Sequence, residues 1–340
     1  MRKSLVLFLL AMALFLSSCK ATRPSPEYTN LTEKTTYSVL KFPPVKFDDI
    51  IWRTDGILLT MQYGRRQPYA LEGDDGLRYL DLEQDSKCNL STNYRYPTQL
   101  PDGRLGLLKM CATDNTFTDK TYMVAYNWNT SQLDQIVQNP LKHFNISECF
   151  SWNPDMTRGI QEVSDGLTGT LSWLTQVGPE PVHITLRDGS RVWNLSQDYE
   201  ENGSTEGGRT SCPSWSPKGD KIAVFVSFDA MGVKGIARLD KQTQLILFSP
   251  ETGESESVLS GIYYPEFIEW SPDGESIAFV GDRTKELWVF NVETPSLFLI
   301  DKGGEFDDLS WSPDSRHIAI IWCDEQDCEK SEIRQYTLPK

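Results

Sequence analysis

Short apolar runs, each preceded by a polar turn, recur along most of the chain. The clearest are DKIAVFV at 220–226, ESIAFVG at 275–281 and RHIAIIW at 316–322. Runs of this length, rich in Ile, Val and Phe and bounded by turn residues, are typical of buried β-strands. Further apolar runs follow the second of them, LWVFNV at 287–292 and LFLI at 297–300. We therefore expect units of about four strands each.

The turns share a sequence in which Trp, Ser, Pro, Asp and Gly follow one another. Trp270–Gly274 has this sequence in full, and the positions equivalent to its Asp are 55, 102, 155, 218, 273 and 314. Pro fixes φ at the first central position of a turn, Asp caps the turn, and Gly accepts the left-handed conformation. The six positions are 41 to 63 residues apart. This period predicts propeller blades and not a helical solenoid.

The WSPDG turn followed by an apolar strand resembles the TolB-like, or PD40, β-propeller family. Three strong and three degenerate copies cover roughly residues 37–340. The resemblance implies an all-β fold, a six-bladed β-propeller with four-stranded antiparallel blades. The last unit lacks an outer strand, and TTYSVLKF at 35–42 can supply it, so that N-terminal chain closes the ring and removes exposed edges. TolB carries an α/β domain before its propeller. This chain departs from it there, so the roles of TolB are not carried over.

The repeated Trp is expected to pack between neighbouring blades, because a large aromatic side chain fills the wedge between twisted sheets. The residues concerned are Trp52, Trp152, Trp215, Trp270 and Trp311.

When the units are aligned on the repeated Trp, four of them have a carboxylate four residues earlier. The second unit has Arg95 at this position. The carboxylates are Asp48, Glu148, Glu266 and Asp307. In a propeller this stretch approaches the innermost strand, so the four side chains are expected near one mouth of the central channel. Converging carboxylates attract cations or basic groups, and oxygen ligands suit Ca²⁺. A ligand or cation site and a solvated acidic rim both remain open.

The N-terminus has the pattern of an export signal. Arg2 and Lys3 precede an apolar run from Ser4 to Leu16, about 13 residues, which is too short to span a bilayer comfortably. The sequence Leu-Ser-Ser-Cys ending at Cys19 resembles the lipobox of bacterial lipoproteins. This resemblance implies cleavage before Cys19 and acylation of its thiol, so that Cys19 contacts membrane lipid.

These patterns divide the chain into a signal peptide at 1–18, a lipidated Cys and flexible tether at 19–36, and the propeller at 37–340. The protein is then exported and anchored to the cell membrane. An Asp after the lipidated Cys would resemble an inner-membrane retention signal. Lys20 stands there instead, which favours the outer membrane in an organism that has one.

Composition narrows the classes of function. The 340 residues carry 33 Lys and Arg against 48 Asp and Glu, a net charge of −15. Nucleic-acid binding needs a basic footprint, so we expect no nucleic-acid partner. Hydrophobic residues are 39% of the chain, which is ordinary for a folded domain. Only three His are present, without close spacing, which makes a His-based metal site or catalytic triad improbable.

Six cysteines follow Cys19, and an even count in an exported protein favours disulfides. Three pairs are candidates, with free buried thiols as the alternative: Cys323 with Cys328 across a hairpin, Cys88 with Cys111, and Cys149 with Cys212. The last two stand three residues before a repeated Trp, and a cross-link needs Cα atoms within about 7 Å.

No catalytic constellation is visible: Gly-x-Ser-x-Gly is missing, and we assign no catalytic residue. The sequence favours a membrane-anchored lipoprotein that presents a TolB-like propeller as a non-catalytic binding or scaffold module for a protein, peptide or glycan of the cell envelope. The alternative is a cation-dependent envelope hydrolase or lyase, with Ca²⁺ at the acidic channel mouth.

Overall fold

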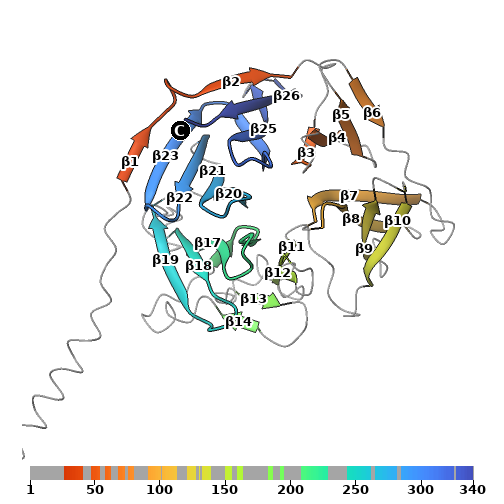
Figure 1. The fold of residues 1–340 in the computed structure, drawn as a ribbon, viewed down its shortest axis with the longest axis horizontal. Coiled ribbons are helices and arrows are strands. Elements are labelled where there is room, and N and C mark those ends of the chain that lie inside the picture. The colour runs from red at the N-terminus through yellow and green to blue at the C-terminus, as the bar shows by residue number, and fades with distance from the viewer. Residues whose placement is uncertain are drawn as a thin grey trace, which may run out of the picture.

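The computed structural model describes the residues that form the strands and many of the turns. They are 27–40, 47–53, 58–62, 68–72, 76–79, 91–100, 102–112, 121–127, 130, 132–138, 150–154, 159–163, 183–186, 192–194, 208–228, 243–261, 265–281, 285–324 and 327–339. The regular elements among them are all β-strands, and they form six sheets. The sheets follow one another in chain order around a common centre (Figure 1).

The first three sheets have four strands each. Sheet one contains β3 (Phe47–Trp52), β4 (Leu58–Gln62), β5 (Pro68–Glu72) and β6 (Gly76–Tyr79). Sheet two contains β7 (Ser91–Gln99), β8 (Leu105–Ala112), β9 (Thr121–Asn127) and β10 (Gln132–Gln138). Sheet three contains β11 (Phe150–Trp152), β12 (Gly159–Val163), β13 (His183–Leu186) and β14 (Val192–Asn194).

The last three sheets repeat this order with small additions. Sheet four contains β15 (Gly208–Thr210), β16 (Ser214–Trp215), β17 (Ile222–Phe228), β18 (Gln244–Phe248) and β19 (Ser255–Ser260), with both β15 and β16 paired to β17. Sheet five contains β20 (Pro265–Trp270), β21 (Ser276–Gly281), β22 (Glu286–Asn291), β23 (Ser296–Lys302) and β1 (Glu27–Asn30). Sheet six contains β24 (Glu305–Trp311), β25 (His317–Asp324), β26 (Asp327–Thr337) and β2 (Thr36–Val39).

The apolar run of β21 is buried on both faces because sheet five lies between sheets four and six. In β21, Ile277 and Phe279 pack with residues of sheet four, while Ala278 and Val280 pack with residues of sheet six. All four are at most 1% exposed. A strand covered on both faces loses the polar–apolar alternation of a surface strand, which accounts for runs such as IAFV.

In sheets four, five and six, the turn after the inner strand is built as its sequence predicts. In sheet five, Gly274 N donates to Ser271 O at 2.8 Å, and Ser271 Oγ accepts from Ser276 N at 2.9 Å and donates to Asp273 Oδ1 at 2.6 Å. Gly274 has φ +74°, in the left-handed region that glycine tolerates best. The same position holds Gly219 at φ +72° and Ser315 at φ +58°.

The N-terminal segment covers the outer edges of two sheets. β2 pairs antiparallel with β26 and completes sheet six, as the sequence predicted for this segment. β1 pairs in parallel with β23 and adds a fifth strand to sheet five, and both strands run along the outside of the molecule (Figure 1). Within the segment 19–36 that the sequence assigns to a flexible tether, Glu27–Asn30 thus forms β1, and Thr36 begins β2.

The first and last sheets are direct neighbours. Phe47 and Ile50 of sheet one share an apolar cluster with Ala319, Ile321 and Ile333 of sheet six. A hydrogen bond from Phe47 N to the buried Ser331 Oγ, 3.3 Å long, joins β3 to β26. Chain segments nearly 300 residues apart in sequence thus pack as closely as consecutive units.

The turn between β23 and β24 offers a test of close packing. A Cβ on Gly304 would lie 2.1 Å from Trp322 Nε1 and 2.8 Å from the Cys323 carbonyl oxygen, whereas a Cβ on Gly303 would meet nothing within 4 Å. Both glycines have positive φ, so Ala strains the backbone at either site. We expect Gly304→Ala to lower the free energy of unfolding by about 3 kcal/mol and Gly303→Ala by about 1 kcal/mol.

Urea unfolding of the two purified variants, followed by tryptophan fluorescence, measures both changes. The difference between them isolates the contacts with Trp322 and the Cys323 carbonyl oxygen, because the backbone contribution is common to the pair. Equal destabilisation would contradict the packing described for this turn.

Candidate functional site

Irregular pairing at the inner strands sets the geometry of the site. The register shifts between Phe47 and Asp49 in β3, and between Phe306 and Asp308 in β24. A comparable shift in β20 lies between Glu266 and Ile268. A β-bulge leaves one residue unpaired and redirects its side chain. Asp307 and Phe267 take these unpaired positions in neighbouring sheets.

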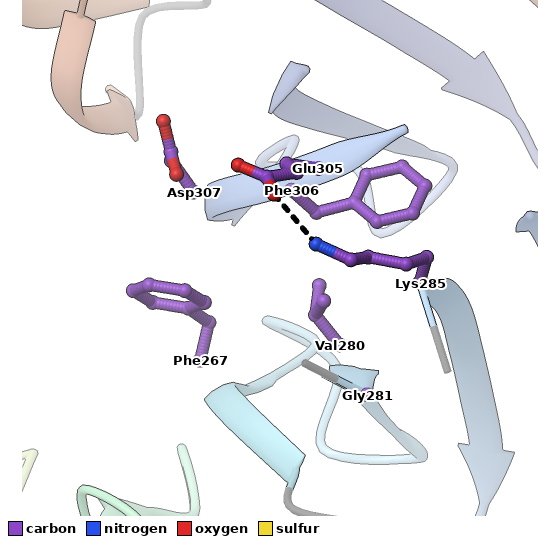
Figure 2. Close-up of a pocket in the computed structure, with 7 residues that line it drawn as sticks. All are labelled: Phe267, Val280, Gly281, Lys285, Glu305, Phe306 and Asp307. Atoms are coloured by element: carbon purple, nitrogen blue, oxygen red, sulfur yellow. Dashed lines mark hydrogen bonds and ion pairs between the residues drawn. The ribbon is translucent and has the colours of Figure 1, made fainter. Parts of the chain in front are cut away.

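A cavity of about 120 Å³ lies where these two bulges meet, between sheets five and six (Figure 2). Its lining comes from β20, β21, the residue before β22 and the first half of β24: Phe267, Val280, Gly281, Lys285, Glu305, Phe306 and Asp307. Figure 2 shows Phe267 and Asp307 on one side of this space and the Lys285–Glu305 pair on the other. Val280 and Phe306 are buried, so part of the wall is apolar.

Two lining residues have a backbone conformation that is rare for their type. Phe267 has φ +46° and Lys285 has φ +53°, and Ser315 is the other non-glycine residue with positive φ in the described chain. Hydrogen bonds hold Lys285 in place: its N donates to Gly281 O, and its O accepts from Gly303 N, both at 2.8 Å. Unfavourable conformations of this kind cluster at binding and catalytic sites, where the surrounding structure imposes them.

The cavity contains opposite charges. Lys285 Nζ lies 2.8 Å from Glu305 Oε1, and the two side chains are 29% and 42% exposed. Asp307, two residues further along β24, is half-buried. The seven lining residues include no hydroxyl, thiol or imidazole group, so this lining can bind and orient a ligand but offers neither a Ser or Cys nucleophile nor a His base.

A second group of carboxylates lies at the inner strands of sheets five, six and one. Asp308 accepts hydrogen bonds from Ile50 N at 2.9 Å and from Leu309 N at 2.8 Å. Burial raises the pKa of Asp308 well above its ordinary value, and the nearby Asp49 raises it further, against the opposing effect of the two N–H donors. Asp308 therefore fixes the edge of β3 against β24.

Glu269 plays a similar part between sheets five and six. Its Oε2 accepts from Trp311 N at 3.1 Å, and its carbonyl oxygen accepts from Trp311 Nε1 at 3.2 Å. The residue as a whole is only partly buried, but its carboxyl group is enclosed by protein. This burial raises the pKa of Glu269 from 4.5 to about 8, although the Trp311 N–H opposes the rise.

Of the four carboxylates expected at the channel mouth, the structure places Asp307 in the cavity. Asp48 and Glu266 have their backbones in β3 and β20, but their side chains lie outside the described part of the chain, as does all of Glu148. Cys19 also lies outside it. Arg95 is in β7, at the start of another register shift. A ring of four carboxylates thus stays a prediction.

The repeated Trp residues lie at contacts between sheets. Trp215, Trp270 and Trp311 are buried and Trp52 is partly buried, while the side chain of Trp152 lies outside the described part. Trp270 Nε1 donates to Ser214 O at 3.1 Å, from sheet five to sheet four. The indoles of Trp270 and Trp311 therefore contribute hydrogen bonds as well as packing.

Two of the six later cysteines are seen as disulfide-bonded, Cys212 and Cys323. The candidate partners are not described: Cys88 and Cys149 lie outside the described residues, as do the side chains of Cys111 and Cys328. The three pairings stay predictions. The neighbouring strands β11 and β16 are joined by a 3.1 Å hydrogen bond from Trp215 N to Ser151 Oγ.

Several residues of the site were not anticipated from the sequence: Phe267, Lys285, Glu305, Glu269 and Asp308. A signal existed for Asp308, because Phe-Asp-Asp occurs both at 47–49 and at 306–308. A signal also existed for Glu269, which precedes the repeated Trp where three other units have Ser. Phe267 and Lys285 carry no such signal, because a bulge and a positive φ at a non-glycine residue follow from tertiary contacts.

Two further findings concern metals and membranes. Among the described residues, no three His, Cys, Asp or Glu side chains are grouped so that they could hold a metal ion. No helix in the same part of the chain has the length and apolar character needed to cross a membrane.

The enclosed carboxyl of Glu269 should make stability depend on pH. The folded protein keeps a proton on Glu269 between pH 4.5 and about 8, whereas the unfolded chain releases it, so this residue lowers stability as pH rises through that window. Glu269→Gln keeps an acceptor for Trp311 N but cannot ionise. We expect it to match the original protein at pH 5 and to exceed its free energy of unfolding by on the order of 2 kcal/mol at pH 9.

Urea unfolding from pH 5 to pH 9 measures the two profiles, with the exposed Glu275→Gln as the control that should leave the profile unchanged. Parallel profiles for Glu269→Gln and the original protein would contradict the burial of this carboxyl group.

Comparison with known proteins supports the fold. No family model matches the chain. Dipeptidyl-peptidase 5 of Porphyromonas gingivalis is 26% identical over 130 residues, which are 35% of this chain and 19% of that protein. The chain thus spans about a fifth of the length of this curated relative.

Solved structures resemble a much larger part of the chain. An oligogalacturonate lyase from Vibrio parahaemolyticus has a TM-score of 0.55 at 13% identity, covering 90% of this chain and 97% of that one. A protein assigned as TolB in Agrobacterium tumefaciens has a TM-score of 0.50 at 16% identity, covering 88% and 92%. TolB from Acinetobacter baumannii has a TM-score of 0.47 at 12% identity, covering 86% of this chain and 63% of that one. With its antiparallel sheets of four strands, the chain has an all-β fold of the TolB-like propeller kind.

Proposed function

We propose that this protein is a membrane-anchored lipoprotein whose TolB-like propeller is a non-catalytic binding module for a protein or peptide of the cell envelope. The observation that carries this proposal is the cavity between sheets five and six. It combines an apolar wall, an ion pair and a further carboxylate, and its lining offers no hydroxyl, thiol or imidazole. An apolar wall with a few placed charged groups is the usual make-up of a site that holds and orients a ligand.

The proposal includes a closed ring of six blades, one for each described sheet. The inner strands of consecutive sheets contact one another at several junctions, and β24 of sheet six contacts β3 of sheet one in the same way. Trp52 N donates to Ser310 Oγ at 3.0 Å across this last junction, just as Trp215 N donates to Ser151 Oγ between sheets three and four. A repeated contact between first and last units is what closure requires.

The anchor would hold the propeller near the membrane. Lipid on Cys19 would be followed by only eight residue steps before β1 begins at Glu27. A fully extended chain of this length reaches at most about 28 Å. The outer rim of sheets five and six would then face the membrane surface, and the faces at the two ends of the channel would stay open to partners.

Lipidation predicts a defined change of location. In the native bacterium, the original protein should stay with the membrane fraction after a high-salt wash, and its intact mass should include acyl chains. Cys19→Ala should lose the acyl mass and the retention, because lipid chains and not charge hold the protein. A Cys19→Ala protein that stays membrane-bound after the same wash would contradict the anchor.

The binding role predicts stable neighbours in the envelope. Crosslinking on intact cells, followed by purification of the protein and identification of the crosslinked proteins, should yield the same partner repeatedly. A Cys19→Ala protein that is released from the membrane should capture much less of this partner.

Metal analysis of the purified protein addresses the alternative of a cation-dependent hydrolase or lyase. Stoichiometric Ca²⁺ that is lost on Asp307→Ala would contradict a purely non-catalytic module of the kind proposed.

A further inference from the structure

We infer that the cavity between sheets five and six takes a single basic side chain, Arg or Lys, from the partner polypeptide. The inference rests on the proposed binding function and adds the chemistry of what is bound.

The size of the cavity sets the first limit on its occupant. Pockets that enclose a whole drug-sized ligand measure roughly 300–1,000 Å³, whereas an engineered cavity of about 150 Å³ holds one benzene ring. At about 120 Å³ this cavity has room for one side chain. A disaccharide or a folded peptide loop would not enter it.

The charges of the lining select the kind of side chain. Glu305 and Asp307 bring two carboxylates, and Lys285 brings one ammonium group, so the lining residues carry two negative charges against one positive charge. The ion pair with Lys285 orients the Glu305 carboxylate, with 2.8 Å between Lys285 Nζ and Glu305 Oε1. An acidic side chain would meet two like charges here. The net charge of −15 on the whole chain also attracts basic partners.

The apolar part of the lining selects a side chain with a long stem. The ring of Phe267 and the carboxylate of Asp307 lie on the same side of the cavity in Figure 2, and Val280 lies across from them, below the end of Lys285. Arg and Lys bury their methylene groups against apolar surface while their charged ends reach polar groups. A cation next to an aromatic ring also gains from the ring's electrostatic field. The bulges that place Phe267 and Asp307 here therefore assemble both halves of such a site.

Affinity points to a polypeptide as the source of this side chain. A free amine that fills one small, partly open cavity has few atoms with which to overcome the cost of binding, whereas a side chain of a larger partner adds to contacts made outside the cavity. Buried Arg residues are typical of such anchors at protein–protein interfaces.

Two immobilised peptides test the inference. One is acetyl-Gly-Gly-Arg-Gly-Gly on a linker, and the other has citrulline in place of Arg. Citrulline has nearly the shape of Arg but carries no charge. Surface plasmon resonance measures how the full-length protein in detergent binds to each. We expect the Arg peptide to bind at least about tenfold more tightly than the citrulline peptide. Asp307→Asn should reduce binding of the Arg peptide by about tenfold, and Phe267→Leu by about threefold.

Glu275→Gln is the matched control, because it removes one exposed carboxylate at the opposite end of β21 and so changes the net charge equally. It should leave binding of the Arg peptide within twofold. Thermal unfolding of each variant checks that it is folded. Equal binding of the two peptides, or equal losses in folded Asp307→Asn and Glu275→Gln, would overturn the inference.

Crosslinking on cells separates this inference from the proposed function. A partner captured equally well by the original protein and by Asp307→Asn would overturn the role of the cavity and leave the binding module standing. Peptides that discriminate as expected, with no partner captured on cells, would support the chemistry of the cavity and count against the proposed function.

Discussion

The structure depends on one repeated contact between consecutive sheets. The backbone N–H of the Trp on one inner strand donates to a side chain of the preceding sheet. That side chain belongs to the residue just before the Trp of its own sheet. Ser151 accepts from Trp215, Glu269 from Trp311, and Ser310 from Trp52. An inner strand that faces another sheet has N–H groups that its own ladder does not use, and a buried N–H without a partner is costly. The contact satisfies these groups and fixes each sheet against the next.

Glu269 shows how this contact tolerates variation and at what cost. A Ser hydroxyl can accept the N–H without bringing a charge into the junction. Glu269 reaches the same N–H, but its carboxyl group is enclosed, and its pKa rises to about 8. Asp308 is also enclosed with a raised pKa, and Asp49 lies close to it. Sheets five, six and one therefore meet around enclosed acids with raised pKa values, whereas the junction of sheets three and four uses a neutral Ser151.

The repeated units, their turns and the joining of β2 to the last sheet could all be predicted from the sequence, because each depends on local rules. Trp270–Gly274 needs only its own residues to form a turn, and IAFV needs only two covered faces to be a strand. The parallel pairing of β1 could not be predicted in this way. Glu27–Asn30 is short and polar, and it forms a strand only because β23 offers an unpaired edge.

The candidate site also depends on contacts between strands that the sequence alone does not predict. Asp307 could be found by aligning the units, because it stands at a fixed distance from Trp311. Its place in the lining of a cavity could not be predicted, because the cavity also needs Phe267 and Lys285, each in a conformation that neighbouring strands impose. At three of the described junctions, the Trp end of the inner strand is occupied by the contact between sheets. The opposite end is free of that constraint, and the bulges there can place different side chains in different sheets. A repeated scaffold can therefore carry a site at one junction without altering the contact that holds the others together.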